Sequence, residues 1–217
     1  MKVRKDPHYQ KLVDQLVKEK TLVTKEIIKA FYRVDRSNFL PSGTESQAGL
    51  NTALEIGYEQ TISQPFTVAF MLELLQPKPG QKVLDIGSGS GWQTALLAGI
   101  VGEEGRVAAL EIVPELKKVG EENLRKFGFR NVEFLAKDGS GGLPKKAPFD
   151  RIIGAAVIPE IPEVLKEQLK VGGRLVMPVG KIDQKIVLII REDKINYHEE
   201  HFPNFIFVPM TGKFGQF

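Results

Sequence analysis

Apolar residues in the first ~75 positions recur at the three- and four-residue spacing of amphipathic helices. Thr24 is placed to cap the second of these helices, and Pro65 is placed to begin the third. We therefore predict three helices in this part of the chain. Their apolar stripes are Leu12, Val13, Leu16 and Val17; Ile27, Ile28 and Phe31; and Val68, Met71, Leu72 and Leu75.

The stretch between the second and third helices, residues 38–60, has no clean period. Pro41, Gly43, Gly49 and Gly57 interrupt it, and we predict a long loop. Long loops in compact domains are often functional. This loop is therefore a candidate for part of a site.

From Lys82 onward, short β-rich runs alternate with helical stretches. This alternation predicts an α/β fold with a doubly wound, mostly parallel sheet and helices on both faces. The last ~35 residues are β-rich and are expected to add antiparallel strands at one edge. We predict one domain, 1–217, with a helical N-terminal extension at 1–79 and a core at 80–217. The expected strands are 82–86, 106–110, 132–136, 149–155, 172–180 and 185–190, and the expected helices are 92–100, 114–127 and 162–169.

A glycine-rich turn follows the first of these strands and opens the helix at 92–100. Glycines let a backbone turn tightly and approach a ligand closely, and the strand-turn-helix context is that of nucleotide cofactor sites. A lone turn of this kind is weak evidence, because it can be purely structural. The candidate residues in it are Asp85, Gly87, Ser88, Gly89 and Gly91.

Two further strand ends strengthen the prediction of a nucleoside cofactor. Glu111 ends the next strand, twenty positions after Gly91, where a carboxylate can accept both ribose hydroxyls of an adenosine. Asp138 and Gly139 end the strand after that, where a carboxylate and a backbone N–H can contact an adenine edge. Together the three strand ends favour a cofactor site over a structural turn.

The chemistry of the turn selects among cofactors. Its G-x-G-x-G spacing differs from the G-x-G-x-x-G of dinucleotide folds, and no Walker lysine follows it. Asp85 would repel a pyrophosphate and suits a ligand with a positive end. Residues 83–91, VLDIGSGSG, resemble motif I of the class I methyltransferases. The resemblance implies the class I methyltransferase fold and S-adenosylmethionine as cofactor, with S-adenosylhomocysteine as product.

Composition and charge exclude several other functions. The chain has no cysteine, three histidines and a formal net charge of +3. Without cysteine there is no disulfide, no thiolate metal site and no cysteine nucleophile, and we expect no metal. A charge this small, without a clustered basic patch, does not predict a nucleic-acid partner.

The N-terminus indicates the expected location. Residues 1–20 are charged throughout and lack the apolar region of a signal peptide. No apolar run approaches the length of a membrane span. We therefore expect a cytoplasmic protein with no membrane partner. We also expect a monomer.

The residues also narrow the class of methyl acceptor. Amino-methylating nucleic-acid enzymes resemble one another in an Asn/Asp-Pro-Pro-Tyr segment, where residues 153–156 of this chain are Ile-Gly-Ala-Ala. His8, His198 and His201 lie in terminal regions, and we expect surface residues there rather than a general base. A carboxylate acceptor fits, because its pKa of about 3.5–4 leaves it ionised at neutral pH. Such an acceptor needs only alignment and desolvation.

A longer set of motifs resembles one family. Residues 61–66, Thr-Ile-Ser-Gln-Pro-Phe, resemble the T-I-S-Q-P signature of the protein-L-isoaspartate O-methyltransferases. Further matches follow in the same order and extend the resemblance over residues 39–212. They are 82–91, 128–132, 138–139, 147–150, 168–169, 172–176, 178–180 and 207–212.

This resemblance implies a substrate and an acceptor site. The family methylates the free α-carboxyl of L-isoaspartyl residues in damaged polypeptides, whose ester then closes to a succinimide. Carried over, Ser63 helps to hold the acceptor carboxylate, Thr61 and Gln64 flank it, and Ala155 and Thr211 border the pocket. A structural alternative for Ser63 is an N-cap for the helix that begins near Pro65.

Some positions depart from the family pattern. The family commonly has Tyr-x-Asp-x-Pro-Leu-Pro-Ile-Gly where residues 49–57 here are Gly-Leu-Asn-Thr-Ala-Leu-Glu-Ile-Gly. Gly154 stands where threonine is usual, and Trp92 where a smaller aromatic residue is common. Two alternatives therefore stay open. One is a methyltransferase of the same lineage with another carboxylate or a small-molecule acceptor, and the other is a non-catalytic S-adenosylmethionine-binding module.

Overall fold

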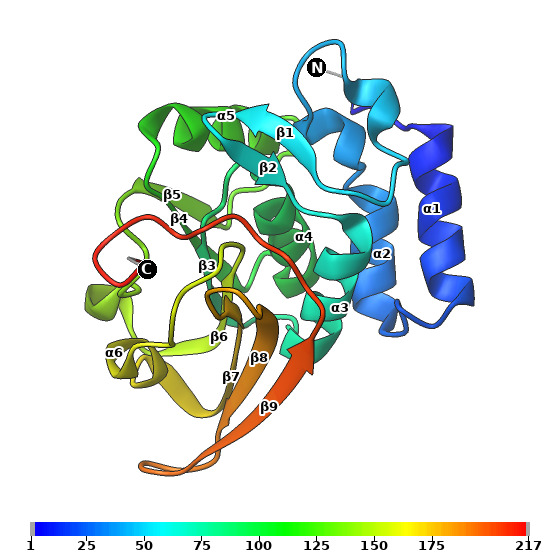
Figure 1. Cartoon of the computed structure of the whole chain (residues 1–217). Coiled ribbons are helices and arrows are strands. Elements are labelled where there is room, and N and C mark those ends of the chain that lie inside the picture. Colours follow the sequence, from blue (N-terminus) through cyan, green and yellow to red (C-terminus); the bar gives the residue numbers. More distant parts are fainter. Residues whose placement is uncertain (1–2, 216–217) are drawn as a thin grey trace.

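The computed structural model describes residues 3–215, and residues 1–2 and 216–217 of the predicted domain lie outside this range. A seven-stranded sheet lies beside a layer of helices, and a short hairpin lies near one end of that layer (Figure 1). The helices are α1 (Pro7–Lys18), α2 (Lys25–Arg33), α3 (Pro65–Leu75), α4 (Trp92–Val101), α5 (Pro114–Arg125) and α6 (Glu163–Lys166), with short 3-10 helices η1 (Arg36–Phe39), η2 (Glu45–Gln47) and η3 (Pro144–Lys146). The strands are β1 (Leu54–Gly57), β2 (Gln60–Ile62), β3 (Lys82–Ile86), β4 (Arg106–Glu111), β5 (Val132–Ala136), β6 (Phe149–Gly154), β7 (Leu169–Val179), β8 (Lys185–Arg191) and β9 (Tyr197–Pro203).

The main sheet has the strand order β5-β4-β3-β6-β7-β8-β9. The first five strands in this order are parallel, and β8 and β9 are added antiparallel at one edge. This confirms the predicted α/β fold with antiparallel C-terminal strands. The order in which the chain adds strands reverses between β3 and β6: β3 to β5 follow one another toward one edge, and β6 to β9 toward the other. Ligands in open α/β sheets bind beyond the carboxyl ends of the strands at such a point.

The two faces of the sheet bury different clusters. Val83 and Ile153 pack in a core with α1 to α4, whereas Leu84 and Ile86 pack in a second core on the other face. This alternation follows from the two-residue period of a strand. Helices α3, α4 and α5 cover the first face, and α1 and α2 pack outside them (Figure 1).

The second face departs from the prediction. Helix α6 has only four residues, and irregular segments cover the rest of this face. The helix predicted over 162–169 is too long because Leu169 pairs with Phe149 and so begins strand β7.

Within the described residues, no helix is both long and apolar enough to span a bilayer.

The N-terminal helices confirm the three predicted stripes, and the predicted cap of α2 is confirmed in position but not in its hydrogen bond. The carboxylate of Asp6 caps α1 by accepting the Tyr9 N–H at 2.8 Å. Thr24 stands at the N-cap of α2, but its side chain makes no cap bond. Its hydroxyl donates instead to the Glu73 carboxylate of α3 at 2.6 Å, because tertiary packing brings that stronger acceptor within reach.

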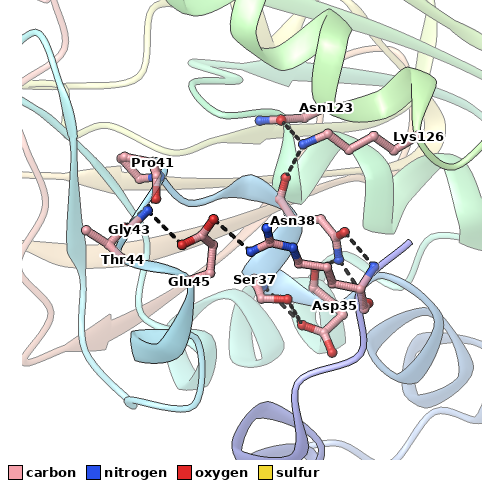
Figure 2. A network of polar contacts seen from close by, with 10 residues as sticks. Asp35, Ser37, Asn38, Pro41, Gly43, Thr44, Glu45, Asn123 and Lys126 are labelled. Atoms are coloured by element: carbon pink, nitrogen blue, oxygen red, sulfur yellow. Dashed lines mark hydrogen bonds and ion pairs between the residues drawn. The ribbon is translucent and has the colours of Figure 1, made fainter. Parts of the chain in front are cut away.

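The segment predicted as one long loop, 38–60, is more ordered than expected. It contains η2 and β1, and β1 pairs with β2 as an antiparallel hairpin. Tyr58 and Glu59 turn the hairpin with φ of +55° and +57°. Glu45 joins this segment to the N-terminus through an ion pair with Arg4 at 2.7 Å (Figure 2).

Candidate functional site

The glycine turn after β3 is shaped by its own backbone and by β4. Gly87, Gly89 and Gly91 have φ of +78°, +49° and +85°, a region that favours glycine. The N–H groups of Gly87 and Ser88 both donate to the Leu110 carbonyl, at 2.9 and 3.0 Å. The turn therefore lies against the end of the neighbouring strand.

Glu111 fastens the tip of this turn. One carboxylate oxygen accepts the Gly89 N–H at 2.8 Å, and the other accepts the Val113 N–H at 3.0 Å. Each carboxylate oxygen can accept a second hydrogen bond. Glu111 can therefore hold the turn and still accept hydroxyl donors from a ligand.

Asp85 lies behind the turn rather than in it. Its carboxylate has no exposed surface and accepts hydrogen bonds from Gln93 at 2.7 Å and Thr94 at 2.5 Å. Burial raises its pKa from 3.8 to about 6, and the bonds from Thr94 and Gln93 oppose this shift only in part. The direct contact with a cationic ligand that the sequence suggested stays a prediction.

A pH effect on stability follows from Asp85. Its pKa is raised on folding, so the folded protein binds this proton more tightly than the unfolded chain does. The stabilisation is complete below pH 4 and is lost as pH rises through about 6. We expect the unfolding free energy of the wild type, relative to Asp85→Asn, to fall by about 2 kcal/mol between pH 4 and pH 7. Urea unfolding of both proteins across this range measures it, and parallel curves would contradict it.

The two residues predicted at the end of β5, Asp138 and Gly139, have different surroundings. Gly139 lies so close to Ile86 and Leu110 that a Cβ would stand 2.8 Å from an Ile86 methyl. Asp138 faces the C-terminal segment and accepts the N–H groups of Ser140 at 2.8 Å and Lys213 at 2.9 Å. The adenine contact predicted for Asp138 stays a prediction.

A narrow cavity joins these strand ends. Its volume is about 60 Å³, well below the ~300–1,000 Å³ usual for ligand pockets. The β1–β2 hairpin bounds one side and the segment 208–211 bounds another. The lining includes Gln60, Thr61, Gly87, Gly89, Glu111, Ile112, Gly139, Ser140, Ala155, Met210 and Thr211.

Ser88 gives independent evidence of a ligand here. Its side-chain oxygen is buried and has no hydrogen-bond partner among the described residues. Buried polar atoms normally have a hydrogen-bond partner, so a buried hydroxyl without one indicates a ligand that forms this hydrogen bond. Ser88 lines a cleft of about 30 Å³ with Ser63, Gly89 and Trp92. The residues present thus suit a polar nucleoside ligand.

A second, larger cavity of about 400 Å³ lies beside the first. Ser63 and Gln64 lie on its wall, and Phe207 and Pro209 lie on the wall formed by the C-terminal segment. Thr61 and Ala155 line both this cavity and the narrow one. The predicted acceptor residues and cofactor residues therefore meet at Thr61 and Ala155.

The Ser63 side chain is free to act in this cavity. Helix α3 begins at Pro65 with Gln64 at its N-cap, so the cap role considered for Ser63 is wrong. The Asn51 side chain takes that role by accepting the Phe66 N–H at 3.0 Å. Within the described residues, the Ser63 hydroxyl makes no hydrogen bond, and its backbone carbonyl accepts one from Arg36.

Three positions that depart from the family pattern have structural explanations. Gly49 packs against α1, where a Cβ would stand 2.6 Å from the His8 Cβ. A Cβ at Gly154 would stand 2.9 Å from the end of the Met177 side chain, which fills that space. Trp92 is buried between Tyr9 and Phe31 and donates to the Val34 carbonyl at 3.2 Å.

The structure adds site residues that the sequence reasoning missed. Of the predicted residues, Asp85, Gly91 and Asp138 line neither the cavities nor the cleft, and the others do. Asn51 and Arg36 act through hydrogen bonds to residues distant in the sequence, and no local motif predicts these bonds. Gln93 and Thr94 stand two and three residues after Gly91, and this closeness to the glycine motif was the one available signal for them.

The chain is similar to known proteins of one family. The family model for protein-L-isoaspartate(D-aspartate) O-methyltransferase (PCMT) matches residues 7–215. A protein-L-isoaspartate O-methyltransferase of Methanococcoides burtonii is 43% identical over 87% of this chain and 93% of its own length. One from Flavobacterium psychrophilum is 46% identical over 94% of this chain and 96% of its own length.

A solved structure shows the same fold. A Plasmodium falciparum chain described as a protein-L-isoaspartate O-methyltransferase, in complex with S-adenosyl-L-homocysteine, matches with a TM-score of 0.83 and 23% identity. The match covers 94% of this chain and 98% of that one. At this identity the likeness concerns the fold, and the family rests on the sequence matches. The chain therefore belongs to the protein-L-isoaspartate(D-aspartate) O-methyltransferase family.

Proposed function

We propose that this chain transfers a methyl group from S-adenosylmethionine to the free α-carboxyl of L-isoaspartyl residues in damaged polypeptides, which initiates their repair. One observation carries the proposal. The free Ser63 hydroxyl lies on the wall of a cavity that adjoins the glycine turn through Thr61 and Ala155. A carboxylate and a methyl donor can therefore meet there.

The cofactor is assigned to the narrow cavity, where the residues suit its parts. Glu111 accepts the ribose hydroxyls, and Ser88 supplies its unpartnered hydroxyl to a polar group. Gly139 offers its backbone to the adenine, and Ile112 offers an apolar surface. Asp85 lies behind the turn and supports it by accepting hydrogen bonds from Gln93 and Thr94 at the start of α4. Asp138 holds the C-terminal segment over the site by accepting the Lys213 N–H.

The acceptor residues position a group that is already reactive. When bound, S-adenosylmethionine supplies an activated methyl group on a sulfonium. A carboxylate is ionised at neutral pH, so no general base is required. Ser63 donates a hydrogen bond to the carboxylate, and Thr61, Gln64, Ala155 and Thr211 shape its surroundings. Alignment and removal of water lower the barrier.

We also propose a domain organisation, a location and an oligomeric state for the enzyme. Residues 1–217 form one methyltransferase domain, in which the N-terminal segment supplies the acceptor side and the core supplies the cofactor side. The enzyme acts as a cytoplasmic monomer on polypeptides rather than on nucleic acids. Sedimentation at micromolar concentration tests the monomer.

The deciding experiment uses two peptides that differ only in isoaspartate versus aspartate, with labelled S-adenosylmethionine. We expect a base-labile methyl ester only on the isoaspartyl peptide. Ser63→Ala should lower kcat/KM about 10- to 100-fold, because a hydrogen bond to a charged group contributes about 1.5–3 kcal/mol. Ser42→Ala, at an exposed serine away from the cavities, is the control.

Each outcome has a distinct meaning. Cofactor affinity should stay within about threefold of wild type in Ser63→Ala if the residue serves only the acceptor. Cofactor binding without methylation of the isoaspartyl peptide would refute the repair function. Turnover on another carboxylate would then favour the alternative acceptor, and no turnover on any would favour a binding module.

A further inference from the structure

Arg36 is a fully buried cation near the acceptor cavity. It begins η1, and the neighbouring Asp35 caps this turn by accepting the Ser37 N–H at 3.0 Å (Figure 2). Asp35 is itself anchored to the start of α1 by the Asp6 N–H at 2.7 Å. The backbone that carries Arg36 is therefore held from two directions.

The guanidinium of Arg36 binds only neutral groups. Among the described residues no carboxylate lies within ion-pair distance, and its Nε atom has no hydrogen-bond partner. It lies 5.5 Å from the centre of the Trp92 ring. Burial lowers its pKa to about 10, so it stays charged at neutral pH. Its acceptors are the carbonyls of Ala48 (3.5 Å), Leu50 (3.0 Å), Thr52 (2.8 Å), Ile62 (3.3 Å) and Ser63 (3.1 Å).

A buried charge without an ionic partner is costly, so its hydrogen bonds must hold the surrounding backbone firmly. Three of the five carbonyls belong to residues 48–52, which lead into the β1–β2 hairpin. The other two belong to Ile62 and Ser63, directly after the hairpin. Arg36 thus closes the hairpin at its base. It also contacts Trp92, the first residue of α4 after the glycine turn.

We propose that Arg36 is a positioning residue for methyl transfer. Its planar guanidinium fixes the carbonyls of Ile62 and Ser63 and so sets where the Ser63 hydroxyl stands relative to the glycine turn. This inference rests on the proposed acceptor role of Ser63. A lysine keeps the charge but cannot reproduce the fork of donors, because its ammonium has three donors around one point.

The test compares Arg36→Lys, Ser63→Ala and the double variant, with Glu73→Ala as a matched control. Glu73 holds the backbone of Val23 and Thr24 and the Thr24 hydroxyl through exposed and half-buried hydrogen bonds, so its loss should lower stability without touching residues 48–63. We expect Arg36→Lys to lower kcat for the isoaspartyl peptide about 10- to 100-fold, as a misplaced group would. Its affinity for S-adenosylhomocysteine should stay within about threefold.

Two readouts separate positioning from a general loss of stability. In the Ser63→Ala background, Arg36→Lys should cost less than about twofold more in kcat, because coupled residues are not additive. Amide hydrogen exchange should quicken in residues 48–63 and stay unchanged in β3 to β8. Additive kinetic losses, or an equal kcat loss in Glu73→Ala, would overturn the proposal.

The same experiment keeps the two proposals apart. If the wild type does not methylate the isoaspartyl peptide, the proposed function fails. The exchange measurement still decides whether Arg36 holds the hairpin base. Unchanged exchange in residues 48–63 overturns the positioning role whatever the turnover.

Discussion

Replacing Glu111 by alanine is expected to weaken S-adenosylmethionine binding by at least about 100-fold. The carboxylate accepts the Gly89 N–H at 2.8 Å and the Val113 N–H at 3.0 Å, and it faces the narrow cavity. Two hydrogen bonds from the ribose hydroxyls to this charged carboxylate would contribute about 3–6 kcal/mol together. The variant therefore loses both the support of the glycine turn and the acceptor proposed for the ribose.

Calorimetric titration with S-adenosylmethionine and S-adenosylhomocysteine measures this loss. Glu115→Ala is a suitable control, because Glu115 is an exposed carboxylate in the first turn of α5, four residues along. The control should bind within about twofold of wild type. A Glu111→Ala protein that binds both ligands within about threefold of wild type would refute the ribose assignment.

Gly91→Ala is expected to lower the unfolding free energy by about 2–5 kcal/mol. Gly91 has a φ of +85°, which costs an alanine about 1–2 kcal/mol. A Cβ there would also stand 2.9 Å from a Leu124 methyl and 3.0 Å from the Gly120 backbone. Overpacking of this kind adds about 1–3 kcal/mol. Helix α5 must therefore shift away from the turn.

Gly128→Ala separates the two contributions. Gly128 has a φ of +71° but nothing within 4 Å of the added Cβ, so only the backbone strain applies. Chemical unfolding of both variants gives the difference, which we expect to be about 1–3 kcal/mol. Equal losses at the two sites would show that the contact between the turn and α5 is unimportant.

The sequence by itself determined the sheet and the strand ends that carry the cofactor side. Patterns of period two and period 3.6 are local, so β3, α4 and β4 appear within a residue or two of their predicted bounds. Glu111 and Gly139 line the narrow cavity because parallel strands bring their carboxyl ends to one edge. Once the strand order is set, no further information is needed to bring these residues together.

The tertiary structure alone decided which side chains remain free. Asp85 and Asp138 stand at the expected strand ends, and folding brings Thr94 and Lys213 to their carboxylates as hydrogen-bond donors. Ser63 is released from a cap role because Asn51, twelve residues earlier, takes it. Hydrogen bonds of this kind depend on which groups folding brings within about 3 Å, and no local period encodes that.

Residues 38–60 show the same limit for backbone structure. Their pattern has no period because η2 and the β1–β2 hairpin are held largely by distant groups. Arg36 alone binds carbonyls from Ala48 to Ser63, and Arg4 reaches Glu45 from the N-terminus. The sequence determined the sheet and the helices on its first face, since the apolar period of each element is a local property. Folding decided the acceptor side, since its geometry depends on a buried cation and on carbonyls far apart in the chain.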